Sequence, residues 1–257
     1  MTTSEDVMAK DEVLGSGPLV ETVKVQAFVV PTDRPEQDGT LEWCSTTAVV
    51  VEVEAGGLTG LGYGYCDRAA ALLIRDRLAG LVVGGDAFAP TALWHAMRAY
   101  LRNLGTPGLG TMALSAVDTA LWDLKARLLD LPLARLLGQV RPAVPAYGSG
   151  GFTNYDDAEM VRQIEGWMEL GLGAAKLKVG RDAGRDRQRV RRARDVLGPD
   201  ATLMVDANGA CTVPQALAQA HAFAGSGVSW FEEPVSSDDL DGLRRMAEAA
   251  PPGLEIT

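Results

Sequence analysis

The second half of the chain alternates short apolar segments with helix-length polar segments at a regular spacing. The apolar segments read VPAYGSG, AAKLKVG, TLMVDANG, VSWFEEP and LEIT, and each of the first four precedes a segment rich in Arg, Ala and Leu. Such alternation predicts parallel strands connected by helices. The spacing matches one strand–helix unit, since 28 residues separate Lys178 from Asp206 and 26 separate Asp206 from Glu232. A regular period favours a (β/α)8-type (TIM-like) barrel over an open sheet.

The open-sheet alternative is a dinucleotide-binding fold, which requires a G-x-G-x-x-G turn directly after a strand. The nearest match, GTPGLG at 105–110, follows helical sequence instead. The barrel is therefore the better interpretation. Because four to five units cannot close a barrel of about 250 residues by themselves, we expect further units after Thr257.

The first half of the chain predicts a separate α+β domain. The runs VKVQAFVV, STTAVVVEVEA and LTGLGYGY are β-like and are separated by the turn-rich insert PTDRPEQDGT and a glycine turn, as in an antiparallel meander. Helical periodicity follows at 69–81 and 90–104. It is clearest at 111–129, where apolar residues recur three and four positions apart.

These patterns divide the chain into three parts. The opening segment MTTSEDVMAKDEVLGSGP carries acidic and small polar residues without an apolar stretch, so we expect a disordered tail and no signal peptide. The predicted fold class is α/β, with the tail at 1–18, an α+β domain at 19–141 and the first four to five strand–helix units of a barrel at 142–257.

The composition restricts the partners. The chain has 24 Lys and Arg against 34 Asp and Glu, a net charge of −10, which argues against nucleic acid or an anionic membrane surface. No apolar stretch approaches the roughly 18 to 20 residues of a membrane span. The three cysteines are far apart and suggest neither a disulfide framework nor a zinc site. A cytoplasmic protein that acts on a small molecule or contacts other proteins fits these features.

Polar residues recur where the predicted barrel strands end. Lys176 and Lys178 end the second strand, Asp206 and Asn208 the third, and Glu232 the fourth. Reactive groups of such barrels lie at this carboxyl-terminal edge. Because side chains alternate along a strand, the two lysines point the same way, as do Asp206 and Asn208. One such residue alone is typical of a solvated strand end, but their recurrence in three units favours a functional site.

These residue types suit one kind of chemistry. Asp206 and Glu232 offer the hard carboxylate oxygens that Mg²⁺ prefers. A lysine beside another cation and a bound metal has its ammonium form disfavoured, so one lysine can act as a base while the other cation binds an anionic substrate. The set indicates removal of the α-proton of a carboxylate substrate, with the metal stabilising the enediolate that results.

The motifs resemble the mandelate racemase and muconate lactonising enzyme branch of the enolase superfamily, in which Lys or His bases work with Mg²⁺. The resemblance rests on KLK, VDANG and WFEEP at the ends of successive strands. It rests also on the N-terminal segments WCSTTAVVVEVEAGGLTGLGYG and LSAVDTALWDLKARLLDLPLARLLG, so it covers nearly everything after the tail. It implies that the α+β domain caps the mouth of the barrel and excludes water.

The resemblance also implies a role for each site residue. Lys178 would be the general base, and Lys176 would help to bind the substrate carboxylate and lower the pKa of its neighbour. Asp206 and Glu232 would be the first two metal ligands. Asn208 is placed like the family's Asn that contacts the substrate near the reacting carbon.

Two further features are less decisive. Tyr147, at the end of the first barrel strand, and the loop 31–43 lie where family members shape specificity, but both fit a structural role equally well. The two histidines, His95 and His221, fall in helical segments and are not candidates. One more unit would place a third carboxylate ligand near 258–260, and the opposing acid or base of the family lies on later strands.

The resemblance therefore implies a cytoplasmic, homo-oligomeric enzyme with Mg²⁺ and a small carboxylate substrate. Acid-sugar dehydratase, a lyase, is favoured because Asn208 suits a hydroxylated substrate. Isomerases of the branch, that is racemases, epimerases and cycloisomerases, share this half of the site and stay open. The alternative from another class is a catalytically silent fragment or scaffold that lacks the third metal ligand and is stabilised by another chain.

Overall fold

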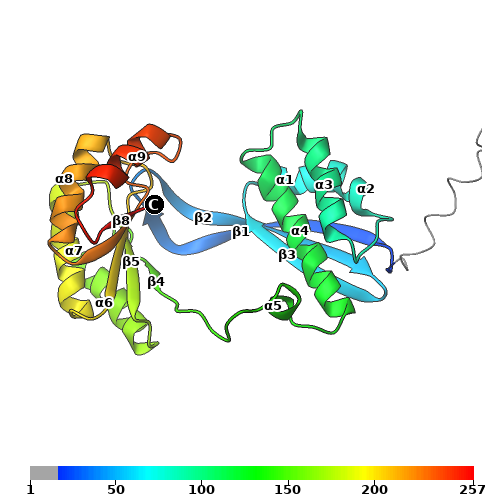
Figure 1. Cartoon of the computed structure of the whole chain (residues 1–257), viewed down its shortest axis with the longest axis horizontal. Helices are drawn as coiled ribbons and strands as arrows, with labels where there is room; N and C mark the ends of the chain where they lie inside the picture. Colours follow the sequence, from blue (N-terminus) through cyan, green and yellow to red (C-terminus); the bar gives the residue numbers. More distant parts are fainter. Residues whose placement is uncertain (1–16) are drawn as a thin grey trace, which may run out of the picture. The chain divides into compact units, whose positions relative to one another are not determined.

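The computed structural model of the protein describes residues 17–257. Most of the expected tail, 1–18, lies outside these residues. Pro18 is described, and its carbonyl accepts a hydrogen bond from the amide of Ala87. The chain forms two compact units, which comprise the residues up to Pro31 with Ser45–Pro142, and Thr32–Cys44 with Ala143–Thr257 (Figure 1). Within residues 17–257, no helix has the length and apolar character needed to cross a membrane.

The first unit combines a three-stranded sheet with helices, which confirms the expected α+β character. The sheet has the order β1-β2-β3, and β2 and β3 pair antiparallel. The strands are β1 (Thr22–Gln37), β2 (Glu42–Ala55) and β3 (Leu58–Tyr65). The helices are α1 (Arg68–Leu73), the π-helical turn η1 (Ile74–Leu78), α2 (Ala79–Val82), α3 (Pro90–Leu101), α4 (Leu109–Leu128) and α5 (Leu133–Leu136). Most of the predicted turn-rich insert, 31–40, is strand, because β1 continues to Gln37 before the chain reverses.

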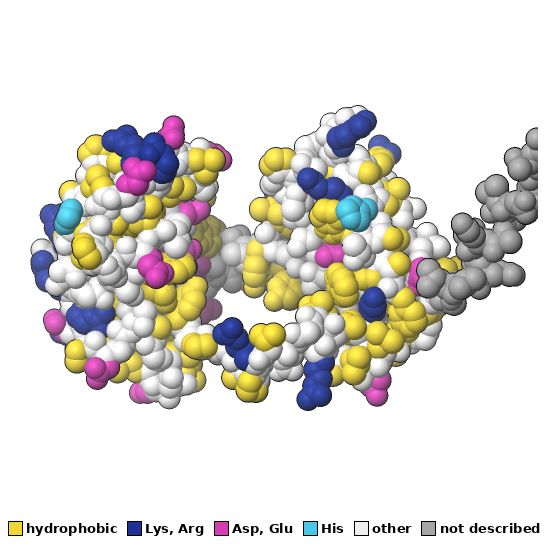
Figure 2. All heavy atoms as spheres, viewed as in Figure 1, with side chains coloured by type: hydrophobic (Ala, Val, Ile, Leu, Met, Phe, Trp, Pro, Cys, Tyr) yellow, Lys and Arg dark blue, Asp and Glu magenta, His cyan; other side chains and the backbone are white. Residues whose placement is uncertain are grey.

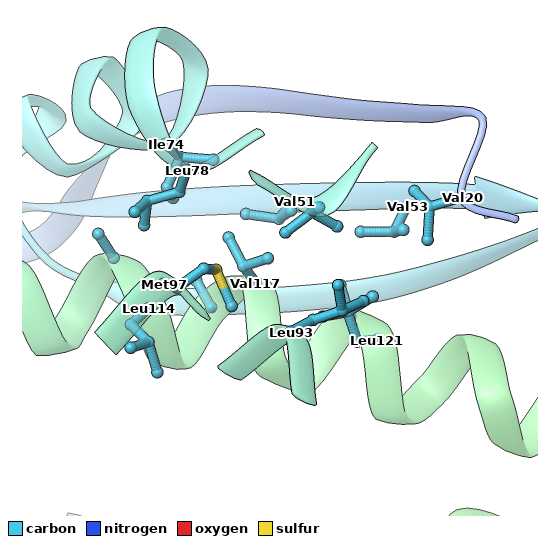
Figure 3. Packing of buried hydrophobic residues seen from close by; sticks show 14 of the residues in the cluster. Val20, Val51, Val53, Ile74, Leu78, Leu93, Met97, Leu114, Val117 and Leu121 are labelled. Carbon is cyan, nitrogen blue, oxygen red and sulfur yellow. The ribbon is translucent and has the colours of Figure 1, made fainter. Parts of the chain in front are cut away.

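Helix α4 covers the sheet of this unit. Figure 3 shows Val51 and Val53 of β2 packed among Met97 of α3 and Val117 and Leu121 of α4. These side chains are fully buried, as the period of two in the strand and the three-and-four spacing in the helix predict. On β3, a Cβ at Gly60 or Gly62 would overlap the backbone of α4, so the LTGLGYGY pattern permits close packing of strand on helix.

The second unit is a run of parallel strand–helix units, which confirms the first part of a TIM-like barrel (Figure 1). The five strands lie in chain order, as right-handed strand–helix–strand connections produce. They are β4 (Gly148–Gly150), β5 (Ala174–Lys178), β6 (Thr202–Asp206), β7 (Val228–Glu232) and β8 (Glu255–Ile256). The helices are α6 (Asp157–Glu169), α7 (Ala183–Leu197), α8 (Val213–Ala224) and α9 (Leu240–Ala249).

Alternation along these strands separates an apolar face from a polar one. Leu177, Val205 and Phe231 are at most 1% exposed and pack with the helices in one core cluster. Residues one position away on each strand point to the opposite face. That face receives the lysines and carboxylates at the carboxyl ends of the strands.

Candidate active site

The ends of three neighbouring strands place the candidate side chains level with one another. In the parallel pairing, Lys178 of β5 lies opposite Asp206 of β6, and Asp206 lies opposite Glu232 of β7. The Nζ atom of Lys178 donates a hydrogen bond of 2.6 Å to Oδ2 of Asp206. Groups that are 26 to 28 residues apart in the sequence thus share one site.

Lys176 lies two residues earlier on β5 and bridges both carboxylates. Its Nζ atom is 2.6 Å from Oε2 of Glu232 and 3.9 Å from Oδ2 of Asp206. The same atom is 5.5 Å from the ring centroid of Tyr147, within the range of a cation–π contact. Because Lys176 is only 7% exposed, its ammonium group is largely removed from water.

Opposing effects act on the pKa of Lys176. Burial lowers this pKa, but the hydrogen bond to Glu232 and the charges of Glu232 and Asp206 outweigh burial and raise the pKa above its usual value. The sequence predicted that a bound metal and a neighbouring cation would disfavour an ammonium form here. Among the protein groups alone, the ammonium form of Lys176 is favoured, because the carboxylates assigned to the metal pair with it. A charged Lys176 nevertheless suits the anion-binding role.

The pKa of Glu232 moves in the complementary direction. Burial raises it, but the hydrogen bond and charge of Lys176, with a further hydrogen bond from Nε1 of Trp230 at 3.2 Å, bring the pKa below its usual value. Trp230 is not among the site residues predicted from the sequence. It stands two residues before Glu232 and so on the same face of β7, which is a signal that strand alternation provides.

Asn208 is held against Asp206 by a tight local turn. Its amide N–H donates to Oδ1 of Asp206 at 2.9 Å, and its side-chain Nδ2 donates to Oδ2 at 3.3 Å. The φ angle of Asn208 is 49°, a left-handed conformation that Asn tolerates better than most residues. Its Oδ1 atom is buried and has no hydrogen-bond partner within residues 17–257. The structure therefore presents an unsatisfied oxygen on a side chain that contacts the carboxylate of Asp206.

The donor set fits Mg²⁺ in part. The carboxylates of Asp206 and Glu232 already converge on one cation, the ammonium of Lys176. Mg²⁺ takes one or two protein carboxylates and completes its shell with water and substrate oxygens. In the described part of the chain, no group of three or more His, Cys, Asp or Glu side chains is arranged to hold a metal. These residues thus offer two of the expected carboxylate ligands.

Tyr147 lies beside the site but not where the sequence placed it. Strand β4 spans Gly148–Gly150, so Tyr147 precedes this strand instead of ending it. The segment 143–147 before β4 has no regular secondary structure, which an apolar pattern does not distinguish from a strand. His95 and His221 lie in α3 and α8, as predicted, and take no part in the contacts described above.

Comparison with known families decides the affiliation of the chain. Residues 21–138 match "Mandelate racemase / muconate lactonizing enzyme, N-terminal domain", and residues 159–256 match "Enolase C-terminal domain-like". The chain belongs to the mandelate racemase/muconate lactonizing enzyme family of the enolase superfamily. The resemblance inferred from the motifs is therefore confirmed.

Curated relatives in this family include cycloisomerases and dehydratases. The chain is 36% identical to a 3,6-anhydro-alpha-L-galactonate cycloisomerase of Streptomyces coelicolor, over 89% of this chain and 65% of the relative. It is 30% identical to an L-talarate/galactarate dehydratase of Salmonella typhimurium, over 91% of this chain and 62% of the relative. The chain thus spans somewhat less than two thirds of the length of these relatives.

Solved structures share the fold over most of the chain. A mandelate racemase/muconate lactonizing enzyme-like protein from Rubrobacter xylanophilus is 52% identical, with a TM-score of 0.91, over 93% of this chain and 67% of that one. A racemase from Streptomyces coelicolor, crystallised with bound magnesium, is 36% identical, with a TM-score of 0.89, over 93% of this chain and 68% of that one. Magnesium therefore occurs in a related structure of the family.

In this member of the family, the tip of the β1–β2 hairpin, Thr32–Cys44, packs on the loops that follow the barrel strands. The amide of Thr153 donates to the carbonyl of Gln37 at 2.7 Å, and Nε of Arg181 donates to the carbonyl of Asp38 at 3.0 Å. From the sequence, both a structural and a specificity role are open for the loop 31–43. These contacts show a structural role, because they fix the hairpin tip beside the carboxyl ends of the strands.

Gly39 makes the closest approach of the hairpin tip to the site. A Cβ atom at this position would overlap the backbone oxygens of Ala207 and Val179, which directly follow Asp206 and Lys178. The absence of a side chain therefore lets the tip rest on the ends of β5 and β6.

We expect Gly39→Ala to reduce the free energy of unfolding by ~1–3 kcal/mol, because overpacking displaces backbone on both sides. Chemical denaturation of the two proteins measures this difference. Gly166→Ala in α6 is the matched control: its Cβ meets nothing within 4 Å, and alanine stabilises a helix interior by roughly 0.5–1 kcal/mol. Equal losses in both variants would contradict the contact at Gly39.

Proposed function

We propose that the whole protein is a Mg²⁺-dependent enzyme that removes the α-proton of a carboxylate, and that its substrate is an acid sugar that it dehydrates. The observation that carries the proposal is the pairing of Lys176 and Lys178 with Asp206 and Glu232 at the ends of adjacent strands. The dehydratases and cycloisomerases among its relatives support the same reaction class.

Each residue of the candidate site has a role in the proposed reaction. Mg²⁺, held by Asp206 and Glu232, would supply positive charge that stabilises the enediolate form of the substrate. Lys176, kept charged in its partly dry site, binds the substrate carboxylate. Lys178 takes the α-proton at its Nζ atom. The Nδ2 group of Asn208 is suited to donate a hydrogen bond to a substrate hydroxyl near the reacting carbon.

Loss of water completes the proposed reaction. Removal of the α-proton leaves an electron pair that expels the β-hydroxyl, which departs as water after it receives a proton. The enol that remains takes one proton from solvent at the former β-carbon and becomes a 2-keto acid. Atoms and charge therefore balance without any oxidant or reductant.

Cycloisomerisation is the second candidate, because two relatives at 36% and 32% identity are cycloisomerases. Such an enzyme rearranges a ring without releasing water, so its product has the mass of its substrate. Racemisation also conserves mass but inverts the α-carbon. Product mass and stereochemistry consequently separate the three reactions, although the proposed role of Lys178 is common to all of them.

The test incubates the whole protein with Mg²⁺ and a panel of sugar acids and their lactones in deuterated water. We expect one acid to lose water and gain one deuterium at the former β-carbon, as seen by mass spectrometry and NMR. A product that keeps the mass of its substrate, apart from deuterium, and has a rearranged ring would favour the second candidate. Absence of product and of α-proton exchange for every acid, together with absence of Mg²⁺ binding by calorimetry, would favour the silent scaffold.

The proposal also concerns partners and location. On the face shown in Figure 2, acidic and basic side chains are interspersed and form no broad basic patch. With the net charge of −10, this supports a small-molecule partner over nucleic acid. A homo-oligomer in the cytoplasm is the setting that we propose for the enzyme.

A further inference from the structure

We propose that Arg189 is a positioning residue that fixes the backbone of Lys178; this inference rests on the proposed function, in which Lys178 is the base. Arg189 lies on α7, outside the set of side chains that would touch substrate or metal. It acts through the peptide groups at the ends of β4 and β5.

The guanidinium of Arg189 is buried and directed at backbone carbonyls. The residue is 2% exposed. Its Nη2 atom donates to the carbonyls of Gly151 at 2.7 Å and Phe152 at 2.8 Å, and Nη1 lies 3.4 Å from the carbonyl of Lys178. A planar group with five donors in a fixed fork can hold several carbonyls in one arrangement.

Both peptide groups of Lys178 depend on this arrangement. Its carbonyl faces Nη1 of Arg189, and its amide donates at 3.2 Å to the carbonyl of Gly151, which Arg189 also binds. Regular pairing of β4 with β5 ends one residue earlier, at Gly150 and Leu177. Arg189 therefore continues the connection between the two strands at the position that carries the proposed base.

The neighbouring residue Asp186 fixes the next turn of the chain. Its Oδ2 atom accepts a hydrogen bond of 2.8 Å from the amide of Gly180. Asp186 is also 2% exposed and lies three residues before Arg189 on the same side of α7. The carbonyl of Lys178 and the amide of Gly180, two residues later, are thus both bound by side chains of one helix.

A contribution to the stability of the fold does not by itself explain why an arginine is buried at position 189. Burial lowers the pKa of Arg189, which means that the charged form is disfavoured by its surroundings, although the charge of Asp186 partly offsets this. Its Nε atom is buried and has no hydrogen-bond partner in the described part of the chain. A protein with a buried ion is often less stable than the same protein with an apolar residue at that position. The hydrogen bonds that Arg189 donates to the carbonyls around Lys178 are the feature that an apolar residue could not supply.

Arg194 provides a matched control on the same helix. Its guanidinium also donates to backbone carbonyls, at 2.7–3.1 Å, but these belong to the segments that lead into β6 and β7. The four carbonyls are those of Gly198, Ala201, Ser226 and Gly227. Loss of Arg194 therefore removes a similar set of hydrogen bonds at the opposite ends of the strands.

The experiment compares Arg189→Gln, Arg189→Lys and Arg194→Gln in the whole protein. We expect Arg189→Gln to lower kcat by about 10- to 100-fold, since a misplacement of about 1 Å costs this much, while KM and the Mg²⁺ affinity stay within about twofold. Arg194→Gln should keep kcat within about twofold. Arg189→Lys, which retains a cation that can reach one carbonyl, should recover part of kcat. Equal kcat losses in the two glutamine variants, at matched folded fraction, would overturn the proposal.

Hydrogen–deuterium exchange reads the backbone directly and needs no substrate. The peptide 174–182 should exchange faster in Arg189→Gln than in the parent and in Arg194→Gln. If no acid is turned over, the proposed function fails while faster exchange confined to this peptide still supports positioning by Arg189. Unchanged exchange there in both Arg189 variants overturns the positioning role, whatever the activity. Should Arg189→Gln not fold, Arg189→Lys supplies the same comparison.

Discussion

Replacing Lys178 by alanine is expected to abolish exchange of the substrate α-proton and to reduce kcat by at least about 10³-fold, in the range of a lost general base. Mg²⁺ affinity should stay equal or rise. The reason is that Lys178 competes for Oδ2 of Asp206 at 2.6 Å, and alanine removes this competing cation. Proton exchange followed by NMR in deuterated water and Mg²⁺ titration by calorimetry measure the two effects separately.

Two other lysine variants make this result specific. Lys176→Ala should raise KM as its main effect, because it removes the charge that we assign to binding of the substrate carboxylate. Lys24→Ala should change neither kcat nor KM, since Lys24 forms an exposed ion pair with Glu54 in the first unit. Persistence of α-proton exchange in Lys178→Ala, in a protein with a normal unfolding transition, would contradict its role as the base.

The sequence was sufficient to predict much of the second unit because its information is local. On β5, the lysines alternate with Ala175 and Leu177, and only one register buries the apolar pair. Regular spacing then places the ends of β5, β6 and β7 at one edge. The lysine–carboxylate cluster follows from these two facts without knowledge of any long-range contact.

The contacts that the sequence did not reveal are long-range or concern a single residue among similar ones. Arg189 lies in the segment DRQRVRRARD, where its arginine neighbours Arg191 and Arg192 are exposed. A signal does exist, since Asp186 and Arg189 fall on the same helical stripe as the buried Val190. Charged residues on an apolar stripe indicate a buried polar contact.

The hairpin tip, Thr32–Cys44, is an example of a long-range contact that the sequence does not predict. Nothing near Gly39 in the sequence indicates that its partners are Ala207 and Val179, which lie more than 100 residues away. Its composition is typical of a solvated turn. Only the three-dimensional arrangement shows why glycine is required, and it does so through backbone oxygens, which carry no sequence signature.

The ion pairs between the lysines and the carboxylates of the site link the binding of Mg²⁺ to the positions of the lysines. Asp206 is 1% exposed and accepts hydrogen bonds from Lys178 and Asn208. A carboxylate at this depth needs cationic or N–H partners. Binding of Mg²⁺ would exchange one set of positive partners for another, so the affinity for the ion depends on how readily the lysines release their carboxylates.

Replacing Asp206 by asparagine is expected to lower the Mg²⁺ affinity by at least about 100-fold, because it removes one of the two carboxylates that we assign to the ion and leaves the charges of Lys176 and Lys178 to repel the dication. Calorimetric titration measures the affinity. A second readout is the unfolding temperature, which Mg²⁺ should raise in the parent protein and leave unchanged in Asp206→Asn, since a ligand of the native state stabilises it by mass action. Glu233→Gln is the matched control, because this carboxylate adjoins Glu232 but stands after the end of β7, in a left-handed backbone conformation, and forms no ion pair with either lysine within residues 17–257. The control should bind Mg²⁺ like the parent, and an Asp206→Asn protein that binds the ion as tightly as the control would exclude Asp206 as a ligand.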